Sequence, residues 1–242
     1  MRNTDVFGSI YKNRTWGDGT EGNPRSGTGS DPINAQIFVH FVRDFITSRK
    51  ISTVLDVGHG DWEMWKEYSF AEVDYLGLDI AAGLSEEIQA KFGKENRKFQ
   101  YYDFEGSNLP SADLLICKDV LQHLSSSDCV ALLEKMKQFK FLVICNDVYV
   151  RESILFEIRN YLLLGKRLRM LSHFKSPFFA YKRRNNSNIE TGEFRGINLL
   201  RRPFVKVLRN FQIIPICDFD APKLLGIKKR IYLLVNKDPE FN

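Results

Sequence analysis

The sequence has no apolar run near the roughly 20 residues that a helix needs to cross a bilayer. Its first residues also lack the apolar stretch of a secretory signal peptide. CxxC spacing is typical of zinc and redox sites, and the four cysteines do not show it. We therefore expect a cytoplasmic protein with no bound metal and with buried free thiols at Cys117, Cys129, Cys145 and Cys217. A zinc site or a disulfide is the alternative.

The net charge of the chain is only +5, but its basic residues are concentrated in one segment. Residues 151–185 hold nine Lys or Arg against two Glu, an excess of 7 that leaves the other 207 residues with a net charge of −2. We expect residues 151–190 to form a helical basic insertion, in which Arg167, Arg169, Arg183 and Arg184 attract an anionic acceptor. An apolar stripe beside these cations also suits peripheral membrane binding, self-association, nucleic-acid binding or simple docking on the domain itself.

Strand-like apolar runs alternate with helical patterns after Ile51. The expected strands are Thr53–Val57, Tyr75–Ile80, Lys98–Tyr102, Asp113–Lys118 and Phe141–Asn146, and the expected helices between them are Trp62–Tyr68, Gly83–Phe92 and Ser127–Phe139. Two later runs, Phe211–Cys217 and Arg230–Asn236, are close enough in sequence to pair antiparallel. This order predicts an α/β fold with a doubly wound, mostly parallel seven-stranded sheet in a single domain over residues 1–242.

Residues 1–32 are rich in Gly, Ser, Asn and Asp and show little periodicity before a helical spacing begins at Ile37. Glycines in the stretch from Arg25 to Ser30 give it hinge freedom, and Trp16 needs a surface to pack against. We expect an N-terminal lid that closes over cofactor and substrate and uses Trp16, Arg25 and Ser26. A disordered leader is the alternative.

The stretch VLDVGHGDWEM, from Val54 to Met64, runs from a predicted strand into a turn with two glycines. Such a turn lets backbone approach a ligand at the carboxyl end of a parallel sheet. The third glycine of the dinucleotide fingerprint is missing, and acids here would repel a pyrophosphate. S-adenosylmethionine has no phosphate and carries a positively charged sulfonium and ammonium, so acidic residues can lie beside it. We expect it to be bound by Asp56, Gly58, Gly60, Asp61 and Trp62.

Acids end the next two predicted strands as well. Asp79 and Asp103 follow Asp56 at spacings of 23 and 24 residues. We expect Asp79 to accept the ribose hydroxyl protons and Asp103 to accept from the adenine amino group, while Phe104 packs on the adenine ring. Ile80 and Lys118 complete the expected cofactor-binding set, and helix capping by these acids is the alternative.

Four segments carry a resemblance to a known family: IYKNRTWGDGTEGNPRSGTGSDP, DVGHGDWEMW, ADLLICKDVLQHLSSSD and GEFRGINLLRRPF. With these, the chain resembles the Rossmann-type, class I S-adenosylmethionine-dependent methyltransferases. It is similar more narrowly to a bacterial group associated with polysaccharide and glycoconjugate gene clusters. Two departures are His59, where the family turn usually has Cys, and residues 151–185, which are longer than the family's connection.

Methyl transfer from a sulfonium is an in-line displacement, and a base is needed only where the acceptor is a hydroxyl or an ammonium. Asp119 and His123 follow the fourth strand four residues apart, so on a helix they would share a face and act as an oriented base pair. We expect these two residues to be catalytic. The alternatives are a helix cap for Asp119 and packing beside the cofactor for His123.

The resemblance places the loop GEFRGINLL over the acceptor site. A guanidinium at Arg195 could hold a carboxylate, a phosphate or sugar hydroxyls there, and a loop salt bridge is the alternative. The expected substrate-binding residues are Arg25, Asp147, Arg195 and Asn198.

These features predict methyl transfer to a small-molecule or sugar acceptor, at oxygen, in glycan or secondary-metabolite synthesis. A nucleic-acid methyltransferase is one alternative, although the fourth strand ends in CKDV and lacks the [DNS]PP[YFW] box of amino-directed enzymes. A cofactor-binding partner protein without catalysis is the other alternative.

Overall fold

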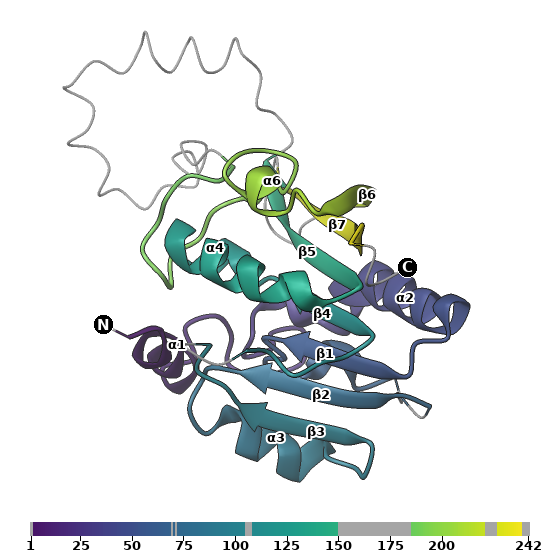
Figure 1. The fold of residues 1–242 in the computed structure, drawn as a ribbon. Coiled ribbons are helices and arrows are strands. Elements are labelled where there is room, and N and C mark those ends of the chain that lie inside the picture. The colour runs from purple at the N-terminus through teal and green to yellow at the C-terminus, as the bar shows by residue number, and fades with distance from the viewer. Residues whose placement is uncertain are drawn as a thin grey trace, which may run out of the picture.

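Seven strands form one sheet in the order β3-β2-β1-β4-β5-β7-β6 in the computed structural model, which describes residues 2–68, 70, 72–104, 108–149, 185–220 and 227–238 (Figure 1). The strands are β1 (Thr53–Val57), β2 (Asp74–Asp79), β3 (Arg97–Tyr101), β4 (Leu114–Lys118), β5 (Phe141–Tyr149), β6 (Phe211–Asp220) and β7 (Ile227–Asn236). The first five run parallel, whereas β7 pairs antiparallel with both β5 and β6. The predicted doubly wound sheet and its antiparallel final pair are confirmed.

Helices cover both faces of the sheet (Figure 1). α2 (Pro32–Arg49) and α3 (Leu84–Phe92) pack on one face, and α4 (Ser126–Lys135) and the short α6 (Phe204–Val207) pack on the other. α1 (Asn3–Lys12) lies beyond the carboxyl ends of the parallel strands. Single 3₁₀ turns are η1 (Thr28–Ser30), η2 (Glu63–Trp65), η3 (Leu121–His123) and η4 (Met136–Gln138).

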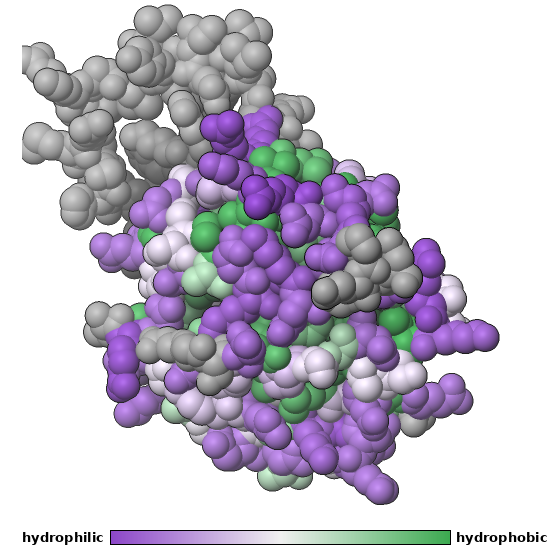
Figure 2. Space-filling model, viewed as in Figure 1, coloured by the Kyte–Doolittle hydropathy of each residue, from purple (hydrophilic) through white to green (hydrophobic). Residues whose placement is uncertain are grey.

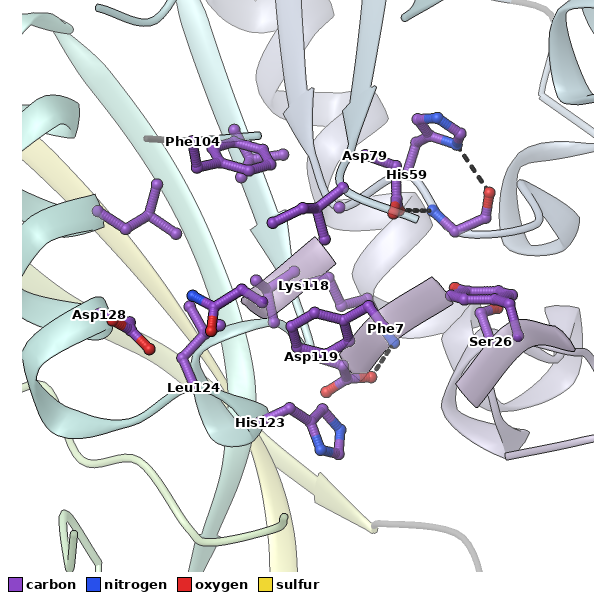
Figure 3. Close-up of a pocket in the computed structure, with 18 of the residues that line it drawn as sticks. Phe7, Ser26, His59, Asp79, Phe104, Lys118, Asp119, His123, Leu124 and Asp128 are labelled. Atoms are coloured by element: carbon purple, nitrogen blue, oxygen red, sulfur yellow. Dashed lines mark hydrogen bonds and ion pairs between the residues drawn. The ribbon is translucent and has the colours of Figure 1, made fainter. Parts of the chain in front are cut away.

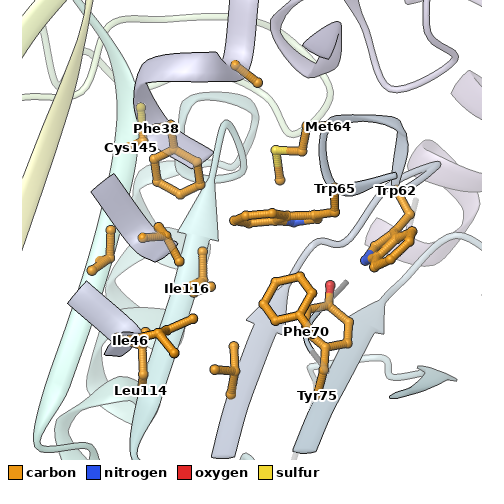
Figure 4. Packing of buried hydrophobic residues seen from close by; sticks show 14 of the residues in the cluster. Phe38, Ile46, Trp62, Met64, Trp65, Phe70, Tyr75, Leu114, Ile116 and Cys145 are labelled. Atoms are coloured by element: carbon orange, nitrogen blue, oxygen red, sulfur yellow. The ribbon is translucent and has the colours of Figure 1, made fainter. Parts of the chain in front are cut away.

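Side-chain alternation along the strands divides the core into two layers. In β4, Leu114 and Ile116 face α2, whereas Leu115 and Cys117 face α4. The layer under α2 holds a cluster of aromatic rings, among them Phe38, Trp62, Trp65, Phe70 and Tyr75 (Figure 4). Trp62 and Trp65 follow the glycine turn after β1, so this packing holds the end of that turn in place.

The ends of α2 follow from local sequence. The Asp31 carboxylate caps its first turn by accepting from the backbone N–H of Ile33 at 3.0 Å, and Pro32 at the first position needs no donor partner. The helix stops at Lys50, which adopts a left-handed conformation. Asp31 thus fixes where the preceding loop ends and the helix begins.

Among the described helices, none is long and apolar enough to cross a membrane. Hydrophilic residues cover most of the face shown in Figure 2, with hydrophobic side chains in scattered patches.

Among the described elements, α1, η2 and the last three strands differ most from the sequence prediction. Residues 3–12 form α1, which the prediction of a lid without periodicity missed. The helix predicted over Trp62–Tyr68 is only the three-residue η2, because Trp62 takes a left-handed conformation and buries its ring in the aromatic layer. The strands β5, β6 and β7 are each longer than predicted. Most of the predicted insertion lies outside the described residues, and residues 185–190 form a turn and an irregular segment.

Candidate functional site

A cavity of about 350 Å³ lies where β1, β2 and β4 end, beneath residues 2–31, which we call the N-terminal cover. Phe104 and Asp128 lie on one side of it and Ser26 on the other (Figure 3). The charged residues of its lining are Asp79, Asp103, Asp119, Asp128, Lys118 and Lys135. Because acids outnumber cations, the cavity favours a ligand with positive charge.

The glycine turn brings backbone to the cavity wall. Gly58 has a φ of 81°, and a Cβ at this position would lie 2.3 Å from a methyl group of Val120. Gly60 has a φ of 59°, and its Cβ would lie 2.9 Å from the Ser26 Cβ and 3.2 Å from the Tyr11 hydroxyl. Both positions therefore require glycine, because of the left-handed backbone and because of the close neighbours.

Asp79 ends β2 beside this turn. Its Oδ2 accepts from the backbone N–H of Gly60 at 3.0 Å, and its Oδ1 accepts from that of Ala81 at 2.9 Å (Figure 3). Each carboxylate oxygen has two lone pairs, so the buried side chain keeps acceptor capacity toward the cavity.

Beyond β3 the cavity is lined by Asp103 and by the ring of Phe104. Phe104 has a φ of 58°, and its carbonyl accepts a hydrogen bond from the Lys135 ammonium at 2.8 Å. That contact ties the backbone beside the ring to α4.

Two polar contacts hold the N-terminal cover against the sheet. The backbone N–H and the hydroxyl of Ser26 donate to the Asp61 carboxylate at 3.2 and 2.5 Å. The Lys118 ammonium donates to the carbonyl of Gly29 at 2.8 Å. Asp61 was predicted to bind cofactor, but it lies outside the cavity lining because its oxygens anchor the cover.

A cluster of mostly buried charges adjoins the cavity at the ends of β4 and β5. Asp119 accepts from Lys118 at 2.5 Å and from Lys229 at 2.7 Å. Lys229 also donates to Asp147 at 2.9 Å, and Gln122 donates to the second oxygen of Asp147 at 3.2 Å. The cluster thus pairs two lysines with two aspartates.

The two carboxylates of this cluster differ in their pKa. Burial acts to raise the pKa of Asp119, but Lys118 and Lys229 outweigh it and hold that pKa well below its ordinary value. Burial raises the pKa of Asp147, because the attraction of Lys229 does not fully compensate it and Asp119 adds repulsion. Asp119 is consequently the more readily ionised of the two carboxyl groups.

His123 lies at the end of η3 and lines the cavity. Its Nδ1 lies 2.9 Å from the carbonyl of Glu193, which can only accept, so Nδ1 carries the proton and Nε2 presents a lone pair. Burial lowers the pKa of His123 to about 4. The Trp16 ring of the N-terminal cover lies 4.6 Å from the imidazole.

The predicted oriented pair of Asp119 and His123 does not form. Asp119 has a φ of 58° and only Leu121–His123 is helical here, so a four-residue spacing does not place both side chains on one helix face. The lysines orient Asp119 and the Glu193 carbonyl orients His123.

Asp56 and Trp62 were predicted to bind cofactor, but both lie in the core. Asp56 accepts from the indole N–H of Trp65 at 3.0 Å and from the hydroxyl of Tyr75 at 2.7 Å. The Trp62 ring packs 5.0 Å from that of Phe92. Asp56 faces the layer under α2, because side chains alternate along β1 and its neighbours Leu55 and Val57 face α4.

The four predicted substrate residues also lie outside the cavity lining. Arg25 pairs with Glu87 at 3.0 Å, and Asp147 belongs to the charge cluster. Arg195 is fully buried and donates to the Ser187 carbonyl at 2.8 Å.

Asn198 likewise holds its own loop, because its side-chain oxygen accepts from the backbone N–H of Leu200 at 3.0 Å. Arg195 and Asn198 therefore shape the segment after residue 185 and do not face the cavity. The predicted residues that do line the cavity are Trp16, Ser26, Gly58, Gly60, Asp79, Ile80, Asp103, Phe104, Lys118, Asp119 and His123.

Among the residues in or beside the site that sequence reasoning missed are Phe7, Tyr11 and Lys229. Phe7 and Tyr11 line the cavity from α1, and the apolar spacing of Phe7, Ile10 and Tyr11 was the available signal. Burial raises the pKa of Tyr11, and Asp79 raises it further. Lys229 was detectable only as a cation at an inward position of an alternating strand.

The described residues contain no group of three or more His, Cys, Asp or Glu side chains that could hold a metal ion.

No protein-family model matches the sequence, and no curated protein is similar enough to be recognised as a relative. Solved structures are similar in fold. Magnesium protoporphyrin IX methyltransferase from Synechocystis PCC 6803, with bound SAH, has a TM-score of 0.61 at 16% identity over 96% of this chain and 97% of its own.

The N-methyltransferase NodS from Bradyrhizobium japonicum WM9, in complex with S-adenosyl-L-homocysteine (SAH), has a TM-score of 0.61 at 10% identity over 96% of this chain and 99% of its own. Human N-acetylserotonin methyltransferase in complex with SAM has a TM-score of 0.54 at 17% identity over 98% of this chain and 60% of its own. These likenesses show that the chain has the Rossmann-like fold of the class I methyltransferases.

Replacing Arg195 by Met should destabilise the fold by about 2 to 4 kcal/mol, because it leaves buried acceptors without their donor. Chemical denaturation measures this change. Arg209→Met is the matched control at an exposed position and should cost less than about 0.5 kcal/mol. Equal stability of the two variants would contradict the structural role of Arg195.

An NMR titration of the imidazoles, assigned with His123→Gln, should place the midpoint of His123 near pH 4. Its pKa in the fold lies below the value of about 6.5 expected for an unfolded chain. Its neutral form therefore contributes stability that is complete above pH 6.5 and is lost as the pH falls toward 4. A midpoint near 6.5 would show that the imidazole is hydrated.

Proposed function

We propose that the protein is an enzyme that transfers a methyl group from S-adenosylmethionine to a small-molecule acceptor. The observation that carries this proposal is Asp79, a buried acid that ends β2 beside the Gly58 to Gly60 turn and lines the cavity. The fold supports it, because ligands of doubly wound sheets bind at the carboxyl ends of the strands.

The charges of the cavity fit this cofactor. Both lining ammonium groups are engaged within the protein, Lys118 with Asp119 and Gly29, and Lys135 with the Phe104 carbonyl. A pyrophosphate would find acids and paired lysines here, whereas a sulfonium and an ammonium are attracted by the acidic lining.

The positions of the residues at the strand ends support a part of the cofactor for each of them. Asp79 would accept from the ribose hydroxyls, Phe104 and Ile80 would flank the adenine with Asp103 at its edge, and the Gly58 turn would lie against the methionine portion. The bound cofactor supplies an electrophilic methyl group on a sulfonium. The N-terminal cover would exclude water from that group.

His123 is the residue that can take a proton from an acceptor hydroxyl. Because Nδ1 is committed to the Glu193 carbonyl, the lone pair is on Nε2, and the Gln122 amide nitrogen reaches this atom only at the long distance of 3.5 Å. In a transfer to oxygen, Nε2 of His123 would take the proton of the acceptor hydroxyl as that oxygen receives the methyl group. Bound S-adenosylmethionine would supply this methyl group from its sulfonium and would leave as the neutral thioether SAH. Asp119 keeps its negative charge and contributes through electrostatics.

A sugar acceptor and a role in glycan synthesis rest on the sequence resemblance alone. The predicted anionic character of the acceptor rested on residues 151–184, which lie outside the described residues. The predicted contacts with a membrane or a second copy rested on the same segment. The acidic lining of the cavity favours a neutral or cationic acceptor at the reacting end.

Calorimetry with SAH should show binding that Asp79→Ala weakens by tenfold or more, since each hydrogen bond to a carboxylate contributes about 1.5 to 3 kcal/mol. Asp74→Ala, at the exposed other end of the same strand, is the matched control and should bind like the parent. Affinity of Asp79→Ala within twofold of the parent, or effective competition by NADH, would reject the cofactor.

An acceptor screen that follows SAH release should include neutral sugars, phenols, amines, nucleotide sugars and transfer RNA. On the best hydroxyl acceptor, His123→Gln should lower turnover by about a hundredfold while SAH affinity stays nearly intact, because a general base contributes that much. His40→Gln, at an exposed position of α2, controls for histidine loss. A parallel fall in SAH affinity and melting temperature would assign His123 to packing instead.

A further inference from the structure

Lys229 occupies an inward position on β7, directly opposite Asp147 on β5. Its side chain is 3% exposed, and its ammonium lies 2.7 Å from Asp119 Oδ1 and 2.9 Å from Asp147 Oδ1. A lysine from the antiparallel end of the sheet thus joins the acids that follow β4 and end β5. Two chains of contacts lead away from it.

The first chain leads to the N-terminal cover. The second oxygen of Asp119 accepts from Lys118, which also donates to the carbonyl of Gly29. Gly29 lies so close to the cluster that a Cβ there would be 2.6 Å from Asp119 Oδ2 and 3.2 Å from Lys229 Nζ. The cover therefore lies directly against the side chains of Asp119 and Lys229.

The second chain leads to the turn that carries His123. Asp147 donates its backbone N–H to the Gln122 side-chain oxygen at 2.8 Å and accepts from the Gln122 amide at 3.2 Å. This two-point contact fixes Gln122, the residue before His123. The backbone carbonyl of Gln122 also accepts from the N–H of Arg195 at 3.0 Å.

We propose that Lys229 is a positioning residue that couples the closure of the N-terminal cover to the placement of His123. Its two carboxylate partners belong to separate chains of contacts, so Lys229 is the group that the two chains share. The role of His123 in this coupling rests on the proposed function, whereas the mechanical link between the two segments does not.

The test variant is Lys229→Met combined with Asp147→Leu. It removes one charge of each sign and leaves Asp119 paired with Lys118, so it avoids two buried carboxylates without a counter-ion. The matched control is Lys228→Met combined with Asp220→Leu, which removes the neighbouring, exposed ion pair of the same hairpin. A second variant, Gly29→Ala, leaves every charge in place and displaces the cover from the cluster.

Hydrogen exchange followed by mass spectrometry reads out the link in the full chain without ligand. In the double variant Lys229→Met, Asp147→Leu, which we call the Lys229 variant, we expect amide exchange to become at least tenfold faster in residues 24–31 and 120–125. Exchange should stay at the parent rate in α3. Gly29→Ala should speed exchange in both segments as well, and the Lys228 variant should match the parent. SAH should bind the Lys229 variant about tenfold more weakly than it binds the control.

Parent-like exchange in both segments of the Lys229 variant would overturn the proposal, and so would a uniform rise that includes α3. If that variant does not fold, Gly29→Ala decides, because faster exchange confined to residues 24–31 would show that the segments are not coupled. Failure of the parent to bind SAH would reject the proposed function alone, since the exchange rates are measured without it.

Discussion

The arrangement of the carboxyl end of this sheet depends on the pairing of opposite charges that are buried away from water. Lys118 pairs with Asp119, Asp119 pairs with Lys229, and Lys229 pairs with Asp147. The exposed fraction of each of these four side chains is 16% or less. An ion without a partner in such a place costs several kcal/mol, so the position of each group restricts that of the next. The ends of β4 and β5, the inward face of β7 and the loop at Gly29 are thereby held in one arrangement.

The same compensation separates the chemistry of Asp119 from that of His123. A carboxylate between two ammonium groups is a weak base, because taking a proton would leave those groups without their counter-ion. A neutral imidazole with a fixed tautomer is better suited to accept a proton, and the Glu193 carbonyl fixes it here. The segment after residue 185 therefore contributes to the site through backbone, although its arginine points into the core.

The sequence predicted the features that depend on local pattern. Alternation of apolar residues located all seven strands, and the glycine turn with Asp79 could be placed at the cavity because strand ends meet at one edge. Side chains whose direction depends on distant partners were misplaced: Asp61 bonds Ser26, and Arg195 fills a gap beside α4. The only local signal of Lys229 was its inward position on an alternating strand, because its partners are distant in sequence.

The distance along the chain from Asp119 to Lys229 is 110 residues. At a synthesis rate of about 5 to 20 residues per second, the ribosome needs roughly 5 to 20 seconds to travel between them. During that interval the parallel strands can already pair, but Asp119 has only Lys118 as a partner and Asp147 lacks its lysine. The strands that line the cavity can thus pair before the cluster is complete, and the charge balance of the cluster waits for the final hairpin to join the sheet.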